Sequence, residues 1–164
     1  QMVDDPSSHP ERFPTEEAQH AERQRLFRLI EDLVKWENTT NETVLAQARE
    51  EAPLECCGLL LGSGRRVERV FRGTNLDRSP VTYNMDPQEL FRAHREMEAQ
   101  GLELVAIYHS HPRTRAYPSS TDVAKATYPD AVYLIISLQD AAAPDVRAFR
   151  IQDGRILEGT VIIE

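Results

Sequence analysis

The chain has 164 residues, enough for one ordinary domain, and its 40% hydrophobic and 28% charged residues are typical of a soluble globular protein. Its formal net charge of −8 argues against nucleic acid or an anionic membrane as the main partner. No apolar run approaches the ~20 residues that span a bilayer, and the acidic N-terminus does not resemble a signal peptide, so we expect a cytoplasmic protein.

The first 40 residues differ in character from the rest. Residues 1–14 carry three prolines among serine and aspartate, which predicts an extended or disordered lead-in. From Thr15 a helix is expected, because apolar residues recur at helical spacing at Leu26, Leu29, Ile30, Leu33 and Val34, with Phe27 and Trp36 widening that surface. We interpret residues 1–40 as an acidic helical arm. The arm either covers the core of the 41–164 domain or provides a homodimer or docking contact.

The next segment predicts a helix followed by a hairpin. Asn41 is suited to cap a helix that runs from Glu42 to about Glu51. Residues 55–61 then read as a strand that turns through residues 62–65 into a second strand at 67–71. Cys56 and Cys57, the two cysteines, are adjacent on that first strand. They are expected to be buried apolar fillers without a disulfide, which fits a reducing compartment.

The second half of the chain alternates helices and strands. Residues 74–80 read as a loop and residues 81–84 as a short strand. Asp86 and Pro87 then begin a helix with Leu90, Phe91, His94 and Met97 on one face. Further strands are expected from about residue 103, at 131–137, at 146–152 and at 156–163. Strands interleaved with helices predict an α/β or α+β fold with helices packed on one sheet.

The stretch LVAIYHSHPRTRAYPSSTD, residues 104–122, carries the chemistry. His109 and His111 are two residues apart on a predicted strand, so both imidazoles leave on one face. Pro112 ends the strand, and the Ser119–Asp122 segment reads as a helix start that is able to return a carboxylate to the histidines. Two imidazole nitrogens and one carboxylate oxygen make a catalytic zinc set that leaves a fourth position for water.

Simpler interpretations of these residues remain open. A His-x-His pair on a strand is often only half-buried and hydrogen-bonded. Ser119 and Asp122 also satisfy a helix capping box, in which each side chain accepts from a backbone N–H of the other residue. Capping and metal ligation are compatible, because one helix start is able to serve both.

These residues resemble the signature of the JAMM (MPN+) zinc metalloproteases, a JAB-domain family. The resemblance lies in His109-Ser110-His111-Pro112 followed by Ser119-x-x-Asp122, together with Glu55 on an early strand, and it extends from about Val44 to the C-terminus. It implies a JAMM/cytidine-deaminase-like fold, a curved and mostly antiparallel sheet flanked by helices, with zinc at the sheet edge. Family members usually open with a strand before the first helix. Here the sequence predicts the helical arm in its place.

The resemblance also implies the site residues. One Zn²⁺ per chain is held by His109, His111 and Asp122, while Glu55 is the general base and acid with a pKa raised by apolar neighbours. Ser119 donates a hydrogen bond to the oxyanion. Ser110 points to the opposite face and supports the fold. Substrate contacts are expected at Asn75, Tyr83 and Tyr117.

The implied reaction is hydrolysis of an amide bond at the C-terminus of a ubiquitin-like or sulfur-carrier protein. Asn75, Ser79-Pro80, Tyr83 and Met85-Asp86-Pro87 resemble the bacterial branch that releases cysteine from a carrier's terminal glycine during cysteine synthesis. Three alternatives stay open. The first is a deubiquitinase-like enzyme that removes a modifier from protein lysines. The second is a non-catalytic scaffold without metal, and the third is a hydrolase of small amides or a DNA-linked substrate.

Overall fold

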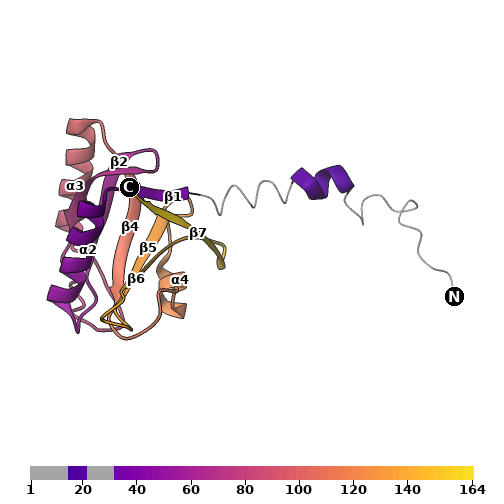
Figure 1. Cartoon of the computed structure of the whole chain (residues 1–164). Helices are drawn as coiled ribbons and strands as arrows, with labels where there is room; N and C mark the ends of the chain where they lie inside the picture. Colours follow the sequence, from indigo (N-terminus) through magenta and orange to yellow (C-terminus); the bar gives the residue numbers. More distant parts are fainter. Residues whose placement is uncertain (1–14, 22–31) are drawn as a thin grey trace.

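The structure is a computed structural model that describes residues 15–21 and 32–164. Residues 16–21 are helical, whereas the predicted lead-in and residues 22–31 of the predicted arm lie outside the described residues. The remaining elements are β1 (Asp32–Trp36), α2 (Asn38–Glu51), β2 (Cys57–Ser63), β3 (Arg66–Arg72), α3 (Pro87–Gln100), β4 (Glu103–His111), α4 (Ser120–Lys125), β5 (Val132–Ser137), β6 (Asp145–Gln152) and β7 (Arg155–Ile163) (Figure 1).

These seven strands form a closed barrel in the order β1-β3-β2-β4-β5-β6-β7. The β2–β3, β2–β4, β5–β6 and β6–β7 pairs are antiparallel, while β1–β3, β1–β7 and β4–β5 are parallel. The predicted mixed α+β class is therefore confirmed. The sheet closes on itself, and β1 is the strand that closes it.

The prediction of a helix through Trp36 is wrong, and so is the inference that the opening strand is missing. Asp32–Trp36 is β1, whose side chains at Leu33, Val34 and Trp36 are at most 2% exposed. Spacing alone fits either structure, but valine and tryptophan favour a pleated, buried surface, and the unpaired sides of β3 and β7 supply partners. The boundary drawn at residue 41 runs through α2, and Leu33, Val34 and Trp36 of β1 pack in the same core cluster as Val44 and Ala48 of that helix.

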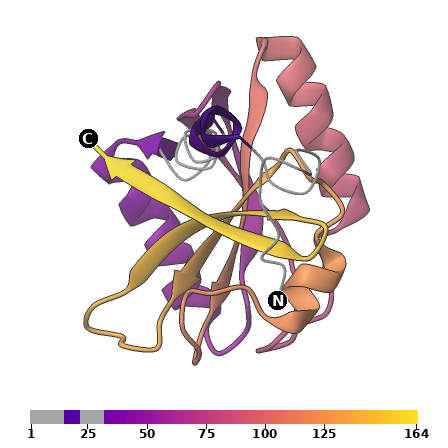
Figure 2. The same ribbon diagram turned by 90° about the vertical axis from the view of Figure 1, so that its right-hand side faces the viewer.

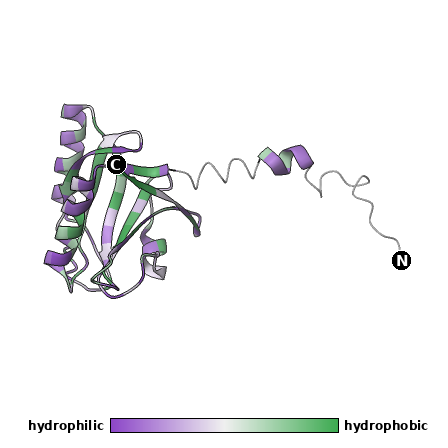
Figure 3. Cartoon of the chain, in the orientation of Figure 1, coloured by the Kyte–Doolittle hydropathy of each residue, from purple (hydrophilic) through white to green (hydrophobic). Residues whose placement is uncertain are grey.

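Two helices cover opposite faces of the central strands. Leu60 of β2 points toward α2 and packs with Val44 and Ala48, whereas its neighbours Leu59 and Leu61 point toward α3 and pack with Ala93 and Met97. Figure 2 shows α2 and α3 on the two sides of these strands. Figure 3 shows the hydrophobic residues concentrated in the central strands. This alternation is the side-chain period of a strand that is buried on both faces.

Several boundaries differ from the sequence prediction. Glu37, not Asn41, is the N-cap of α2, and Asn41 lies inside the helix. Residues 81–84 form no strand, and an isolated bridge between Asn75 and Met85 closes this loop instead. The Asp86 cap and the Pro87 start of α3 are confirmed, but Phe91 is 64% exposed and lies off the buried face. Within residues 15–21 and 32–164, no helix is both long and apolar enough to cross a membrane.

The role of β1 in closing the barrel predicts a sharp truncation boundary. A protein lacking residues 1–31 should keep a cooperative thermal transition, whereas one lacking residues 1–37 should lose it, because β3 and β7 would both have unpaired edges.

Trp36→Ala should lower the free energy of unfolding by about 3–5 kcal/mol. The exposed N-cap variant Glu37→Ala, whose side chain makes no capping bond, should change it little. Circular-dichroism melts measure both, and a cooperative transition in the 38–164 protein would contradict this role.

Candidate active site

Three side-chain atoms from β4 and α4 converge at one point. His109 Nε2 lies 3.1 Å from His111 Nε2 and 3.2 Å from Asp122 Oδ2, and His111 Nε2 lies 3.0 Å from the same Oδ2. All three side chains are buried. They form the one group of metal-ligand type found in the described part of the chain. The predicted convergence of the two imidazoles and the carboxylate is therefore present.

The local sequence explains how each of these residues is placed. The two histidines are alternate residues of β4 and leave the strand on one face. Asp122 is fixed by a capping box at the start of α4: Ser119 Oγ accepts from the Asp122 N–H at 3.1 Å, and Asp122 Oδ2 accepts from the Ser119 N–H at 2.9 Å. The predicted capping pattern is confirmed, and the oxygen that caps the helix is also the oxygen that faces the histidines.

Neighbouring groups set the protonation of these residues. Burial lowers the pKa of His109, which favours its neutral imidazole. Burial lowers the pKa of His111, but its hydrogen bonds to Asp122 and to the Arg115 carbonyl, which lies 2.8 Å from Nδ1, outweigh burial and raise it. Burial alone would raise the pKa of Asp122, but hydrogen bonds from both histidines hold it well below its usual range. The carboxylate is therefore ionised at neutral pH.

Glu55 lies on the same side of the sheet as the histidines. The antiparallel β2–β4 register pairs Cys57 with His109, and Ser110 N donates to the Cys56 carbonyl at 3.1 Å, so the pairing continues beyond the end of β2. The next register positions place Glu55 opposite His111. Directly opposite residues share a face of an antiparallel pair, and Glu55 and Cys57 share a face by alternation. In agreement with this placement, the charge of His111 lowers the pKa of Glu55, and the charge of Asp122 raises it.

The Glu55 carboxyl is buried without a counter-ion at hydrogen-bonding distance among the described residues. The side chain is 2% exposed, and Oε1 has no hydrogen-bond partner there. Burial raises its pKa to about 8, more than the nearby His111 lowers it. A carboxyl group that titrates near neutral pH is suited to take up a proton and release it again. The predicted upward shift from apolar surroundings is present.

The predicted substrate contacts fall in three different settings. Asn75 is buried, and its amide is fully used: Nδ2 donates to the Glu55 and Thr82 carbonyls, and Oδ1 accepts from two backbone N–H groups of the same loop. Tyr83 stacks on His109 with ring centroids 4.5 Å apart. Tyr117 packs edge-on against Phe149 at 5.6 Å. Tyr83 is therefore at the metal-ligand group, while Asn75 holds the backbone of Glu55.

The serine and cysteine neighbours of the site have the expected structural positions. Ser110 Oγ accepts from the Cys56 N–H at 2.8 Å on the face of β4 away from the histidine side chains. Cys56 and Cys57 are buried, free, and point into opposite clusters. Burial raises the pKa of Cys56 to about 12, so its thiol is a poor nucleophile.

The geometry of the three atoms fits a divalent ion better than mutual hydrogen bonding. The two imidazole Nε2 atoms lie 3.1 Å apart, and both lie within 3.2 Å of the same carboxylate oxygen. Whichever tautomers are present, at least one of these three contacts joins two donors or two acceptors, so hydrogen bonding alone leaves one repulsive contact. Ligand atoms around a tetrahedral ion with bonds of ~2.0–2.1 Å lie about 3.3 Å apart, close to the three separations. His109 Nδ1 and Glu55 Oε1 have no hydrogen-bond partner among the described residues. The site therefore has buried polar atoms that this part of the chain leaves unsatisfied.

Sequence reasoning missed two groups at the site. The Arg115 carbonyl orients His111, and a backbone group in a loop gives no sequence signal. Lys125 lies three residues after Asp122, one helical turn along α4, and its Nζ is 3.4 Å from the Tyr83 carbonyl and 3.6 Å from Asp77 Oδ2. The Asp122 to Lys125 spacing on a predicted helix was a signal that could have placed Lys125 beside the site.

Comparisons with known proteins agree with this geometry. Residues 38–152 match the family model described as prokaryotic homologs of the JAB domain. The chain is 43% identical over 120 residues to the CysO-cysteine peptidase of Mycobacterium tuberculosis, covering 72% of this chain and 82% of that protein. It is 40% identical over 115 residues to a probable TtuB-protein conjugate cleaving protease of Thermus thermophilus, covering 70% and 73%. A Desulfitobacterium hafniense protein of known solution structure aligns with a TM-score of 0.74 at 38% identity, covering 80% and 92%.

The raised pKa of Glu55 predicts a pH-dependent stability in protein stripped of metal by a chelator. The unfolded chain ionises Glu55 above about pH 4.5, whereas the fold keeps it protonated until about pH 8. Its contribution is thus fully present below pH 4.5 and is lost as the pH rises toward 8, by up to a few kcal/mol at ~1.36 kcal/mol per pH unit. Glu55→Gln should therefore melt above the unmodified protein at pH 8 and alongside it at pH 4.5.

The exposed variant Glu98→Gln is the matched control and should show no such pH-dependent difference. Thermal melts of all three proteins across this range check the prediction. An unchanged gap between Glu55→Gln and the unmodified protein from pH 4.5 to pH 8 would contradict it.

Proposed function

Because the chain belongs to the family of prokaryotic JAB-domain homologues, we propose that it is a zinc peptidase that hydrolyses the amide bond after the C-terminal glycine of a ubiquitin-like sulfur-carrier protein and releases cysteine. The chain is an enzyme of the peptidase class, like the relatives it matches. The observation that carries the proposal is the placement of the buried Glu55 opposite His111, on the face where His109, His111 and Asp122 converge.

We assign the ligand set to His109 Nε2, His111 Nε2 and Asp122 Oδ2, with one ion per chain. Zinc is the metal that fits two imidazoles and one carboxylate with a position left for water. When bound, it supplies a Lewis acid that lowers the pKa of water from about 15.7 to about 7. Two neighbouring groups support this set: the Tyr83 ring stacks on His109, and the Arg115 backbone carbonyl accepts from His111 Nδ1.

Glu55 is assigned as general base and then general acid. It takes a proton from the attacking water as the water oxygen bonds to the glycine carbonyl carbon. It then gives that proton to the nitrogen of the leaving amine as the C–N bond breaks. Ser119 Oγ accepts the Asp122 N–H and keeps its own O–H free to donate, which suits it to stabilise the oxyanion that forms on the former carbonyl oxygen.

The carrier-tail substrate is favoured by the M. tuberculosis relative, a CysO-cysteine peptidase that matches over 82% of its length. A second candidate is cleavage of an isopeptide bond between a ubiquitin-like modifier and a protein lysine, which the Thermus relative supports. Both reactions use the same groups and the same terminal glycine. They differ only in the leaving amine, which is a free amino acid in the first case and a protein lysine in the second.

We also propose that the catalytic domain begins at residue 32, because β1 completes the barrel. Residues 1–31 then lie ahead of it, and any docking or dimer contact would be a function of that segment. A scaffold without metal is the alternative that metal analysis separates from an enzyme.

Removal of a ligand should remove the metal. His109→Ala and Asp122→Ala should each fall from about one zinc per chain to a small fraction of that after dialysis, because two ligands hold zinc far more weakly than three. The helix variant His94→Ala, an exposed residue outside the ligand group, should keep full zinc. Elemental analysis of the dialysed proteins measures this. Full zinc in both ligand variants would refute the assignment, and its absence in the unmodified protein would favour the scaffold.

Turnover is tested on CysO extended by one C-terminal cysteine. Incubation with zinc-replete protein should shorten the carrier by the mass of that residue, as read by mass spectrometry. Glu55→Gln should reduce the rate about 10²- to 10⁴-fold while zinc content stays the same, because it removes the acid–base group without touching a ligand. The exposed variant Glu42→Gln should retain the full rate. An intact carrier after prolonged incubation with the zinc-replete protein would overturn this substrate.

A further inference from the structure

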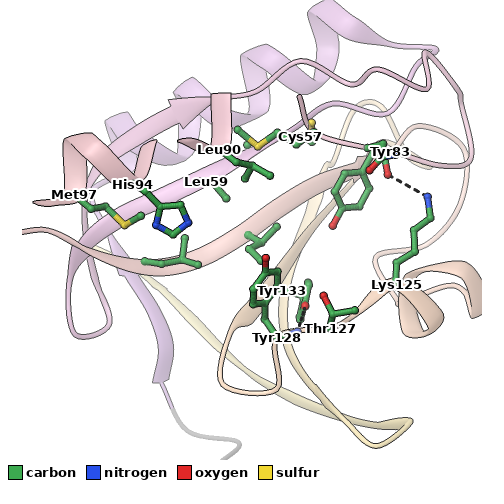
Figure 4. A pocket seen from close by; sticks show the side chains of 15 residues that line it. Cys57, Leu59, Tyr83, Leu90, His94, Met97, Lys125, Thr127, Tyr128 and Tyr133 are labelled. Carbon is green, nitrogen blue, oxygen red and sulfur yellow. Dashed lines mark hydrogen bonds between the residues drawn. The ribbon is translucent and has the colours of Figure 1, made fainter. Parts of the chain in front are cut away.

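A cavity of about 240 Å³ opens beside the metal-ligand group, between α3, β4 and the segment that follows α4 (Figure 4). Two of its lining residues are neighbours of His109: Cys57 is its register partner on β2, and the Tyr83 ring stacks on it. Tyr83 and Lys125 lie together at one end of the cavity, and His94 and Met97 lie at the other (Figure 4). The cavity therefore adjoins the metal-ligand group through the Tyr83 ring.

The lining of the cavity is apolar with one fixed positive charge. Leu59, Met97 and Ile107 are among the apolar side chains that line it. Of the described lining residues, Lys125 is the only lysine or arginine, and none is aspartate or glutamate. The positive charge of the cavity lining is thus opposite in sign to the net charge of −8 of the whole chain. An apolar cavity with a single cation at the catalytic end is complementary to a small ligand that carries one anionic group and an uncharged body.

Lys125 is held in place but is not committed to a strong partner. Its contact with the Tyr83 carbonyl is long at 3.4 Å, and its ion pair with Asp77 is longer still at 3.6 Å. About half of the Lys125 side chain is exposed. Such a half-exposed pair is weak, so a ligand carboxylate is able to share or replace Asp77 at the ammonium group.

We propose that this cavity is the subsite for the released amino acid, and that Lys125 selects it by pairing with its α-carboxylate. This inference rests on the proposed function and specifies its substrate class as a carrier that ends in a single amino acid with a free carboxylate. The acyl side of the cleaved bond is glycine, which has no side chain to fill a cavity. The volume lies below the ~300–1,000 Å³ of sites for drug-sized ligands and suits one residue.

The same arrangement separates the two candidate reactions. Cysteine joined to the carrier through its α-amine keeps a free carboxylate next to the bond that breaks. A protein lysine joined through its ε-amine has no carboxylate near that bond. Lys125 is unchanged in the hydrolysis, in which water oxygen joins the glycine carbonyl carbon and the proton passes to the cysteine nitrogen. It acts by binding the leaving residue, so it is a specificity residue for the free acid.

The test compares two forms of one carrier, CysO ending in cysteine with a free carboxylate and the same protein ending in cysteine carboxamide. The unmodified zinc-replete enzyme should prefer the acid by about 10- to 100-fold in kcat/KM, the range expected for a hydrogen bond to a charged group. Lys125→Met should bring this acid-to-amide ratio close to one. Lys125→Arg should keep part of it, and Lys35→Met, which changes the only other lysine, should keep all of it.

A second readout does not depend on turnover. Binding of the acid and amide carriers to Glu55→Gln protein, measured by calorimetry, should show the same preference. Addition of Lys125→Met to this background should abolish it. Equal cleavage or equal binding of the two carriers by protein with an intact Lys125 would overturn the subsite and leave the peptidase function standing.

A purely structural role for Lys125 also has a distinct signature. An equal loss for both carriers in Lys125→Met would show that Lys125 only ties α4 to the loop that carries Tyr83, and this would overturn the proposal. If neither carrier is cleaved, the proposed function fails, and the acid-to-amide binding ratio still decides the subsite.

Discussion

The antiparallel register between β2 and β4 is the constraint on which the site depends. It pairs Cys57 with His109, and the Ser110 N–H to Cys56 carbonyl bond continues the pairing one step further. Glu55 therefore faces His111 on the side where the metal-ligand group forms. A slip of one residue would turn Glu55 to the opposite face, because the side-chain period of a strand is two. The packing of α2 and α3 on alternate residues of β2 opposes that slip.

The second constraint is the dual use of one carboxylate. Asp122 Oδ2 completes the capping box at the start of α4 and also faces both imidazoles. The helix start and the ligand set are thus built by the same bonds, and neither needs a separate positioning element. The six-residue helix α4 is sufficient here, because Asp122, the ligand that the helix positions, also takes part in the capping box at its N-terminus.

The site is costly for the fold without a metal ion. Two imidazoles and two carboxyl groups are buried together, and Glu55 Oε1 and His109 Nδ1 are unpaired among the described residues. Burial of polar groups without partners is unfavourable, and the cost here appears as the raised pKa of Glu55. The same burial suits Glu55 to its proposed role, because a carboxylate that is destabilised in its ionised form accepts a proton readily. Stability and the proposed acid–base role therefore oppose each other at one residue.

The sequence by itself determined the parts governed by local spacing. The face shared by His109 and His111 follows from the strand period, and the Ser119–Asp122 cap follows from the capping pattern, while Glu55 was reached only through family resemblance. Tertiary structure decided what depends on distant partners. Asp32–Trp36 forms a strand because it pairs with the edges of both β3 and β7, although the spacing of its apolar residues also fits a helix. Lys125 gained its place beside Tyr83 only when the loop before α3 folded against α4, a contact between segments 42 residues apart.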